Sequence, residues 1–377
     1  MGFLEFFVPA FKGIGVIFGI LFLCLYTVLA ERKISAWVQG RRGPNRTTLP
    51  VVGSIPVIGR CITRMGMFQP MADGGKLLFK EDLIPGHVNR FYFVIAPILA
   101  FIPALIAVSV VPFGQYISAT TGTVRTLILT DIDVGILLVF AIASFGVYSL
   151  ILAGWSSNSK YPLLGGIRAA AQMISYEMAM VVSVIPVFLW VNGPGGAGTL
   201  SLVRVVEVQE NFWFAIWQPM SALIFIIAIF AETNRLPFDM PESETDLVGG
   251  YHTEYASFKF GLFFVGEYAN MLIGSCLVVL LFFGGWHPLP WITWNEVAEW
   301  TNLPFWFSGI PGALVSLITF MAKTFLMLFL FILVRWTLPR FRYDQVMRIG
   351  WKVLLPASIG NLVFNAVLIA MIDRFWN

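Results

Sequence analysis

Acidic side chains are concentrated between positions 232 and 267 of this sequence. Seven of its 21 carboxylates lie there: Glu232, Asp239, Glu242, Glu244, Asp246, Glu254 and Glu267. A solvated loop is the simplest explanation for such a run. A functional explanation is favoured over a solvated loop for two reasons. Arg235 lies inside the run, and Glu177 and Glu267 fall within long apolar stretches. Burial favours a protonated carboxyl group and basic neighbours favour an ionised one, so the pattern predicts a proton relay more strongly than structural hydrogen bonding.

Three ionisable side chains lie deep inside apolar stretches. Glu177 follows Arg168 by nine residues, and Glu267 follows Lys259 by eight. A helix rises about 1.5 Å per residue, so each carboxylate lies roughly 12–14 Å from the basic end of its stretch. That depth is near the middle of a hydrocarbon core about 30 Å thick. Lys323 precedes Arg335 by twelve residues, so the same rise places it about 18 Å from the basic end of its stretch. A charge at such depth costs at least about 2.5–3.5 kcal/mol and usually marks an ion pathway.

Membrane helices are the elements that must position these groups. Crossing the hydrocarbon takes about 20 apolar residues, and eight stretches qualify, at approximately residues 8–30, 91–111, 134–154, 169–191, 212–231, 260–284, 312–334 and 353–372. Of all residues, 58% are hydrophobic and 12% are charged, whereas a soluble domain carries about 25% charged residues. This composition excludes a water-soluble enzyme, a disordered protein and a nucleic-acid binder. It predicts an all-α polytopic membrane protein with eight transmembrane helices in a single domain, residues 1–377.

Lys and Arg are distributed unequally between the two sets of loops. Nineteen of the 24 lie in the first, third, fifth and seventh loops, and four lie in the other loops and the termini. The positive-inside rule therefore places the odd-numbered loops in the cytoplasm and both termini on the outer, periplasmic side. Within the long first loop (31–90), we expect a surface helix at 68–80 and a proline- and glycine-bearing inserted stretch at about 47–67. The acidic loop 232–259 lies on the same side.

Cofactor motifs are weak in this sequence. The three cysteines are scattered and form no CxxC pair, so they support neither a disulfide framework nor a zinc or iron–sulfur site. The three histidines are isolated, which is more often a structural arrangement than a metal site. Residues 193–198 match GxGxxG, but they follow a membrane helix instead of a strand, so we interpret them as a loop.

Motifs from the first to the last predicted helix occur in the order seen in one known family. They are ERK at 31–33, RRGPN at 41–45, QPMADGGK at 69–76, LAGWSSNSKY at 152–161, RAAAQMISYE at 168–177, the run 231–255, GEYAN at 266–270 and PRFRYDQVMRIGW at 339–351. The sequence resembles the membrane subunit at the heel of proton-pumping NADH:quinone oxidoreductase, respiratory complex I. This is the H subunit of the bacterial enzymes and subunit 1 of the mitochondrial ones. The eight helices expected from composition agree with the fold that the resemblance implies.

The resemblance implies a role for each group of polar residues. The subunit would form much of the quinone chamber, where the peripheral arm meets the membrane, lined by Arg32, Arg41, Asp73 and Phe264. A proton path toward antiporter-like subunits would use Glu177, Glu232, Glu242, Glu244, Asp246, Glu254 and Glu267. Arg235 and Asp239 would shape a mobile coupling loop. Asp246 stands where many relatives carry Glu, which places its carboxyl group differently.

The resemblance also implies the setting of the chain. A quinone (ubiquinone or menaquinone) would be the substrate, and FMN and iron–sulfur clusters would be held by partner subunits, so that no complete active site lies on this chain alone. Its partners would be the peripheral-arm quinone-site subunits, antiporter-like membrane subunits and membrane lipid, with no nucleic acid. The expected location is a bacterial cell inner membrane rather than an organellar one.

Two further functions are compatible with the sequence. The buried carboxylates also fit a stand-alone cation/proton antiporter, and a homologous subunit serves as a membrane anchor in a related energy-converting hydrogenase. One departure from the family is the length of chain between Asn45 and Gln69, 23 residues, which is more than the family pattern requires. We expect this insertion to contact a peripheral subunit or to border the quinone mouth.

Overall fold

The computed structural model describes residues 3–48, 58–117, 123–193, 198–240, 249–292, 294, 296–297 and 309–376. Three predicted proton-path residues, Glu242, Glu244 and Asp246, lie outside the described residues, as do positions 49–57 of the inserted stretch. Within the described ranges the chain is helical apart from its loops and one short β-hairpin. The all-α prediction is therefore confirmed.

Seven helices among the described residues are long and apolar enough to cross a membrane. Six of them are α1 (Phe3–Val38), α5 (Arg90–Ala107, extended by the 3-10 turn η1, Val108–Val110), α6 (Gly135–Ser156), α7 (Lys160–Asn192), α12 (Ser257–Phe282) and α14 (Gly309–Thr337). The seventh is formed in succession by α15 (Tyr343–Ile349), the π-helical turn η4 (Gly350–Leu354) and α16 (Leu355–Trp376). Each of these corresponds to one of the predicted apolar stretches.

The remaining predicted stretch, residues 212–231, is divided into two helices. α9 (Phe214–Trp217) is followed by Gln218, and α10 (Pro219–Glu232) begins at the next residue. Proline has no backbone N–H and fits the first position of a helix, so Pro219 starts a new helix instead of continuing α9. The 14 residues of α10 span about 21 Å, which is shorter than a hydrocarbon core of about 30 Å. The helix length therefore does not confirm an eighth crossing.

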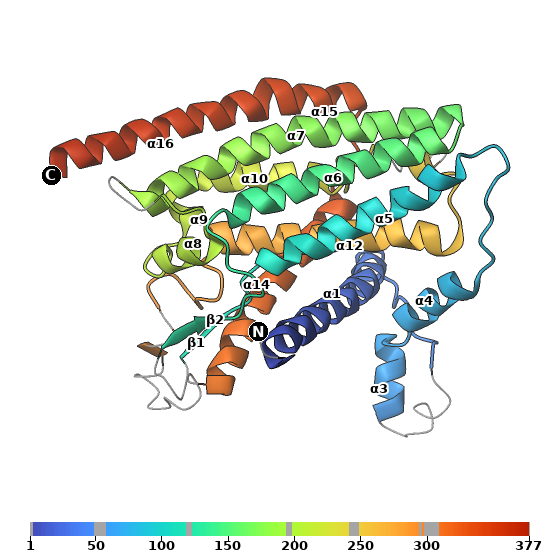
Figure 1. The fold of residues 1–377 in the computed structure, drawn as a ribbon, viewed down its shortest axis with the longest axis horizontal. Helices are drawn as coiled ribbons and strands as arrows, with labels where there is room; N and C mark the ends of the chain where they lie inside the picture. The colour runs from blue at the N-terminus through green and yellow to red at the C-terminus, as the bar shows by residue number, and fades with distance from the viewer. Residues whose placement is uncertain are drawn as a thin grey trace.

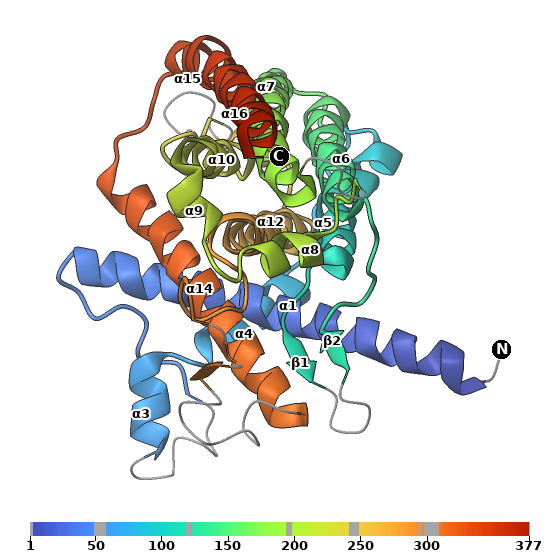
Figure 2. The same cartoon turned by 90° about the vertical axis from the view of Figure 1, so that its left-hand side faces the viewer.

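The long helices form a bundle with a buried centre (Figure 1). α5, α6, α7, α10, α12 and α16 run side by side along the bundle, whereas α1 and α14 cross it at a steep angle (Figure 2). α12 lies in the middle, and 18 of its 26 residues are buried. A helix that is apolar on all sides is buried on all sides. Most of α12 is therefore inside the protein, and the side chain of Glu267 on this helix is only 16% exposed.

Short elements cover the two ends of the bundle. At one end they are α4 (Gln69–Phe79) and η2 (Gly250–His252), with α3 (Ile58–Met65) projecting away from the bundle below α4 (Figure 1). At the other end they are α8 (Leu202–Val208), β1 (Gln115–Ile117) and β2 (Val124–Thr126). α4 lies within the predicted surface-helix segment. The hydroxyl of Ser257, at the start of α12, donates hydrogen bonds to the carbonyls of Leu77 (3.0 Å) and Lys80 (2.7 Å). These bonds attach α4 to the bundle.

The β-hairpin was not predicted from the sequence. β1 pairs antiparallel with β2, and the backbone N–H of Gln115 in β1 donates to the hydroxyl of Ser316 in α14 at 3.2 Å. The indole N–H of Trp286 donates to the side chain of Gln115 at 2.9 Å. The hairpin therefore closes the end of the bundle at which α12 finishes, which we call the far end.

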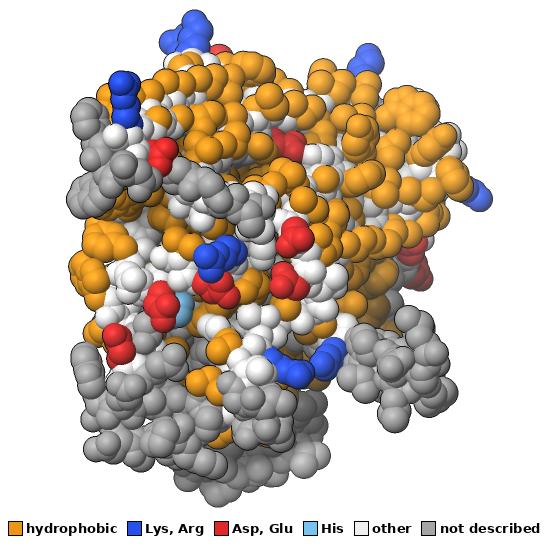
Figure 3. All heavy atoms as spheres, turned by 60° about the vertical axis from the view of Figure 1, so that its left-hand side comes forward, with side chains coloured by type: hydrophobic (Ala, Val, Ile, Leu, Met, Phe, Trp, Pro, Cys, Tyr) orange, Lys and Arg blue, Asp and Glu red, His pale blue; other side chains and the backbone are white. Residues whose placement is uncertain are grey.

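Apolar side chains cover much of the bundle surface (Figure 3). Large exposed hydrophobic residues include Phe18 on α1, Leu326 on α14 and Phe364 on α16. Contiguous apolar surface of this kind is typical of contact with lipid or with other subunits.

Candidate functional site

Glu31 on α1 is a buried carboxylate that two arginines approach. Only 8% of the residue is exposed. It pairs with Arg335 of α14, accepts a 2.6 Å hydrogen bond from the hydroxyl of Tyr268 on α12, and has its Oε2 3.8 Å from Nη1 of Arg235. A buried charge is tolerated when it has an opposite charge and hydrogen bonds. Glu31 receives both from segments that are far apart in the sequence.

Arg235 connects Glu31 to a second carboxylate, Glu267. Its guanidinium lies 4.4 Å from the centroid of the Tyr268 ring, and its Nη2 lies 3.9 Å from Oε2 of Glu267. Glu267 also accepts a 2.8 Å hydrogen bond from the hydroxyl of Tyr251 in η2. The four charged groups therefore alternate in sign. We call them the charge series, in the order Arg335, Glu31, Arg235 and Glu267.

The end of α10 explains why Arg235 is buried. Asn234 has a φ of 50°, and the backbone N–H groups of Asn234 and Arg235 donate to the carbonyls of Ala231 (3.3 Å) and Phe230 (3.2 Å). This pair of bonds is a Schellman motif, in which a left-handed Gly or Asn ends a helix and reverses the chain. The side chain of Gln172 on α7 donates to the Ala231 carbonyl at 2.8 Å and supports the turn. The chain is thereby returned to the interior, where only 5% of Arg235 is exposed.

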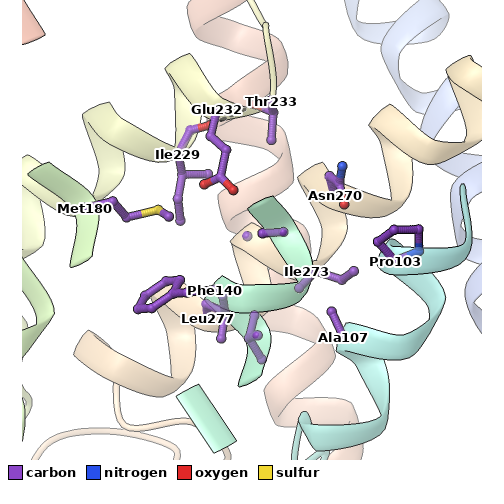
Figure 4. A pocket seen from close by; sticks show the side chains of 13 residues that line it. Pro103, Ala107, Phe140, Met180, Ile229, Glu232, Thr233, Asn270, Ile273 and Leu277 are labelled. Atoms are coloured by element: carbon purple, nitrogen blue, oxygen red, sulfur yellow. Dashed lines mark hydrogen bonds between the residues drawn. The ribbon is translucent and has the colours of Figure 1, made fainter. Parts of the chain in front are cut away.

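A cavity beside the charge series contains the carboxyl group of Glu232. Figure 4 shows this group pointing into the cavity, whose other polar lining residues are Thr233 and Asn270. The cavity volume is about 40 Å³, which is room for about three water molecules. Asn270 follows Glu267 by three positions on α12, so both lie on one face of that helix. The cavity therefore adjoins the charge series.

Glu177 of α7 lies near Glu232. It accepts a hydrogen bond from the hydroxyl of Ser144 on α6, and its charge repels that of Glu232. The structure therefore brings three of the predicted proton-path residues, Glu177, Glu232 and Glu267, into one region of the bundle.

Two of the four residues predicted to line a quinone chamber are in contact. Arg32 at the end of α1 pairs with Asp73 of α4, and the amide of Gln69 donates to the other oxygen of Asp73 at 2.9 Å. The side chains of Arg32 and Asp73 are 49% and 33% exposed, so this pair lies at the surface. Arg41 is exposed beyond the end of α1 and donates to the side chain of Gln39.

Phe264, the fourth of these residues, belongs to a separate aromatic group on α12. Its ring centroid is 4.6 Å from that of Phe260 and 6.2 Å from the imidazole of His252. Burial lowers the pKa of His252 to about 4, although the carboxylate of Asp239 opposes this change. A neutral imidazole therefore borders the aromatic group at neutral pH.

The coupling-loop residues differ in their surroundings. Asp239 is 4% exposed, and its Oδ2 lies 3.0 Å from Nη2 of Arg340, which joins this loop to the segment after α14. Glu254 is partly exposed after η2, and within the described ranges its side chain makes no ion pair or hydrogen bond. The adjacent Tyr255 stacks on Phe93 at 4.0 Å, and burial raises the pKa of Tyr255 to about 12. The structure does not bring Glu254 into the charge series.

Comparison with known proteins decides the family. The family described as NADH dehydrogenase matches residues 11–366. This chain belongs to the NADH dehydrogenase family. It is 44% identical to NADH-quinone oxidoreductase subunit 8 of Rhodothermus marinus, over 91% of this chain and 92% of that protein. It is 41% identical to an NADH-quinone oxidoreductase H subunit of Koribacter versatilis, over 97% of both chains, and 42% identical to one of Geobacter metallireducens, over 94% of both.

Family membership confirms the resemblance inferred from the motifs. Members of the NADH dehydrogenase family are subunits of NADH-quinone oxidoreductase, and this member has the apolar helices of a multi-pass membrane protein. Across the described ranges, no group of three or more His, Cys, Asp or Glu side chains is arranged to hold a metal ion.

Four residues of the site were missed by the sequence analysis: Glu31, Tyr251, Tyr268 and Arg335. A signal was available for Glu31 and Tyr268, because they lie in the ERK and GEYAN motifs of the NADH dehydrogenase family. No comparable signal marks Arg335, because it is one of many basic residues in the loops. Its role depends on the packing of α14 against α1.

Proposed function

We propose that this chain is the membrane subunit of NADH:quinone oxidoreductase that borders the quinone chamber and couples quinone reduction to proton translocation. The family supports the enzyme. The observation that carries the coupling role is the charge series, which adjoins the cavity of Glu232 inside the bundle. Ionisable side chains that face a bundle interior or a water-filled cavity at membrane depth mark ion and proton pathways.

Arg235 is the group through which a proton change would spread along the series. Its separations from Glu31 and Glu267 are 3.8 Å and 3.9 Å, both longer than a direct hydrogen bond of about 2.7–3.2 Å. The guanidinium is therefore shared between two carboxylates. If Glu267 takes up a proton, it loses attraction for Arg235, and the guanidinium moves toward Glu31. If Glu267 releases the proton, the movement reverses.

The quinone end of this proposal involves the exposed pair of Arg32 and Asp73 together with Phe264. The half-exposed guanidinium of Arg32 has donors directed to solvent, which suits the carbonyl oxygen of a quinone. The rings of Phe264 and Phe260 offer apolar surface for the quinone ring. Reduction to quinol consumes protons, so a change of charge at this end would act on the neighbouring carboxylates. Arg41 would line the entrance of the quinone chamber with Arg32, and the inserted stretch would contact a peripheral subunit or border the quinone mouth.

The proposal includes the setting of the subunit. The chain would cross a bacterial inner membrane eight times, with α9 and α10 together forming the fifth crossing and both termini on the outer side. Loops 31–90 and 232–259 would then face the cytoplasm. FMN and iron–sulfur clusters would be held by partner subunits of the peripheral arm, and antiporter-like subunits would continue the proton path that includes Glu242, Glu244, Asp246 and Glu254.

Affinity capture of the tagged chain from its own membranes in mild detergent tests this assignment. We expect co-purification of an NADH-oxidising arm with NADH:quinone reductase activity. Capture of a nickel–iron hydrogenase would instead assign the chain to the anchor of that enzyme. The purified chain reconstituted alone in vesicles is expected to transport no ions, and cation/proton exchange by the chain alone would contradict the proposal in favour of an antiporter.

A further inference from the structure

A second cation, partly buried, lies toward the far end of the bundle, away from the charge series. Lys323 on α14 donates hydrogen bonds from Nζ to the carbonyls of Phe283 (2.7 Å) and His287. Its ammonium also lies 4.4 Å from the centroid of the Trp213 ring. Within the described residues, no carboxylate forms an ion pair with it. Among the described residues, backbone carbonyls and an aromatic face therefore balance the ammonium, and no anion does.

The polar groups around Lys323 lack hydrogen-bond partners. His287 is 7% exposed, and among the described residues its imidazole approaches the backbone of Val206, but neither ring nitrogen has a well-formed hydrogen bond. The indole nitrogen of Trp213 is also buried without a partner. Buried polar atoms of native proteins are nearly always paired by protein or by ordered water. Three such atoms around one ammonium form a polar site at which water would supply the missing hydrogen bonds.

His287 is in the state that accepts a proton. It lies in the connection between α12 and α14, outside the spanning helices. Burial and the adjacent Lys323 charge lower the pKa of His287 to about 4, so its ring is neutral at neutral pH. A neutral imidazole carries one N–H donor and one nitrogen acceptor, and it can therefore receive a proton at one nitrogen and release it from the other.

α12 connects this pocket to the cavity of Glu232. Leu277 lines that cavity, and Phe283, six residues further along, accepts the hydrogen bond from Lys323. The intervening rise is about 9 Å, and residues 277–282 are all at most 4% exposed and apolar. Thr324, next to Lys323, lies 3.9 Å from the thiol of Cys276 and borders this stretch. Lys323 therefore sits across a short apolar layer from the cavity.

We propose that Lys323 and His287 form a second proton-transfer site, which receives protons from the Glu232 cavity and releases them at the far end. This inference rests on the proposed function. In the transfer step, one N–H bond of the Lys323 ammonium breaks and one N–H bond forms on a ring nitrogen of His287, directly or through one water. The imidazolium then gives a proton to water at the far end, and the neutral lysine is reprotonated from the cavity side. No electron is transferred.

The substitution Lys323→Arg distinguishes proton transfer by Lys323 from a purely structural role of its charge. A fixed ammonium could serve only to cap the unpaired carbonyls at the end of α12, because such carbonyls favour a cation. Arginine would preserve that charge, donate to carbonyls and stack on an aromatic ring, but it does not deprotonate in proteins. Lys323→Arg therefore keeps the cap and removes the proton transfer.

The test compares K323R with the same substitution at the exposed Lys352, in the assembled enzyme reconstituted in vesicles. Quinone-linked NADH oxidation and proton uptake are measured together. We expect K323R to assemble and oxidise NADH but to lose proton translocation per electron, and K352R to match the wild type. His287→Gln, which leaves the ammonium in place, is expected to reproduce the loss.

A wild-type ratio of protons to electrons in K323R would overturn the inference and leave Lys323 as a helix cap. If K323R fails to assemble, the test rests on H287Q. A wild-type ratio of protons to electrons in H287Q would also overturn the transfer step. Failure of the wild-type enzyme to translocate protons would refute the proposed function itself, so the two failures are distinguishable.

Discussion

The sharing of Arg235 between Glu31 and Glu267 has an energetic consequence. Removing one partner from a buried ion pair leaves an uncompensated charge, at a cost of about 3–5 kcal/mol. With Arg235 gone, Arg335 faces Glu31 while Glu267 loses a cation, so the series carries one excess negative charge. Removing the charge of Glu31 as well balances the series again.

Arg235→Gln is therefore expected to destabilise the subunit. The double variant Arg235→Gln with Glu31→Gln is expected to lose less stability than the two single variants lose together. The measurement is the midpoint of thermal dissociation of the purified enzyme in detergent, for the wild type, both single variants and the double variant. Additive losses would show that the two side chains are not coupled.

His252 makes the region around η2 sensitive to acid. Burial lowers its pKa from 6.5 to about 4, so the unfolded chain binds a proton between these values while the folded protein does not. His252 therefore does not lower the free energy of unfolding above about pH 6.5. As the pH drops toward 4, this free energy falls by at most about 1.4 kcal/mol per pH unit.

His252→Gln, which does not titrate, is expected to lose less stability than the wild type between pH 7 and pH 5. Thermal midpoints at the two pH values measure this difference. The exposed His87 provides a matched control, since His87→Gln is expected to behave like the wild type. Equal acid sensitivity in the wild type and the His252 variant would contradict the prediction.

The end of α10 is the element that aims Arg235 into the bundle. Asn234 holds the left-handed conformation that the turn requires, and this conformation costs most L-residues about 1–2 kcal/mol. Asn234→Ala is therefore expected to destabilise the protein more than Asn234→Gly, because glycine adopts positive φ without strain. Chemical or thermal unfolding of both variants measures the difference. A more stable alanine variant would show that the backbone conformation is not the constraint.

Elements were predictable from sequence where their apolar pattern was long and uninterrupted. Hydropathy located seven crossing helices, and the amphipathic segment around Met71 and Leu78 located α4. The break at Pro219 was missed because residues 212–231 are apolar throughout, and a hydropathy window does not register a single missing N–H. The hairpin was missed because its strands have only three residues each. It is held by the hydrogen bond between Gln115 in β1 and Ser316 in α14, and these two residues are distant in the sequence.

The candidate site was predictable only in part, because its pairings are made by the whole molecule. The depth of Glu177 and Glu267 in apolar stretches marked them from sequence alone. The ion pair of Glu31 with Arg335 joins residues 304 positions apart and exists because α1 and α14 cross the bundle steeply (Figure 2). Nothing in the sequence pattern selects Arg335 from the other loop cations. The residues predicted to line a quinone chamber came from the family resemblance, and of the four the structure brings Arg32 and Asp73 into contact.

The charge series is assembled from α1, α12, α14 and the end of α10, so the proposed coupling depends on the fold of the whole subunit. Glu267→Gln keeps the size and polarity of the side chain but removes its proton. A matched control is Glu207→Gln, since Glu207 is an exposed residue at the far end, paired with Arg204 at 3.0 Å. Exposed pairs of this kind contribute at most about 1 kcal/mol.

The most direct measurement is the number of protons translocated per electron by the enzyme in sealed vesicles, with quinone as acceptor. We expect the Glu267→Gln enzyme to assemble, to turn over more slowly and to translocate fewer protons per electron, and the Glu207→Gln enzyme to match the wild type. An assembled Glu267→Gln enzyme that translocates protons at the wild-type ratio would contradict the claim that these buried carboxylates carry them.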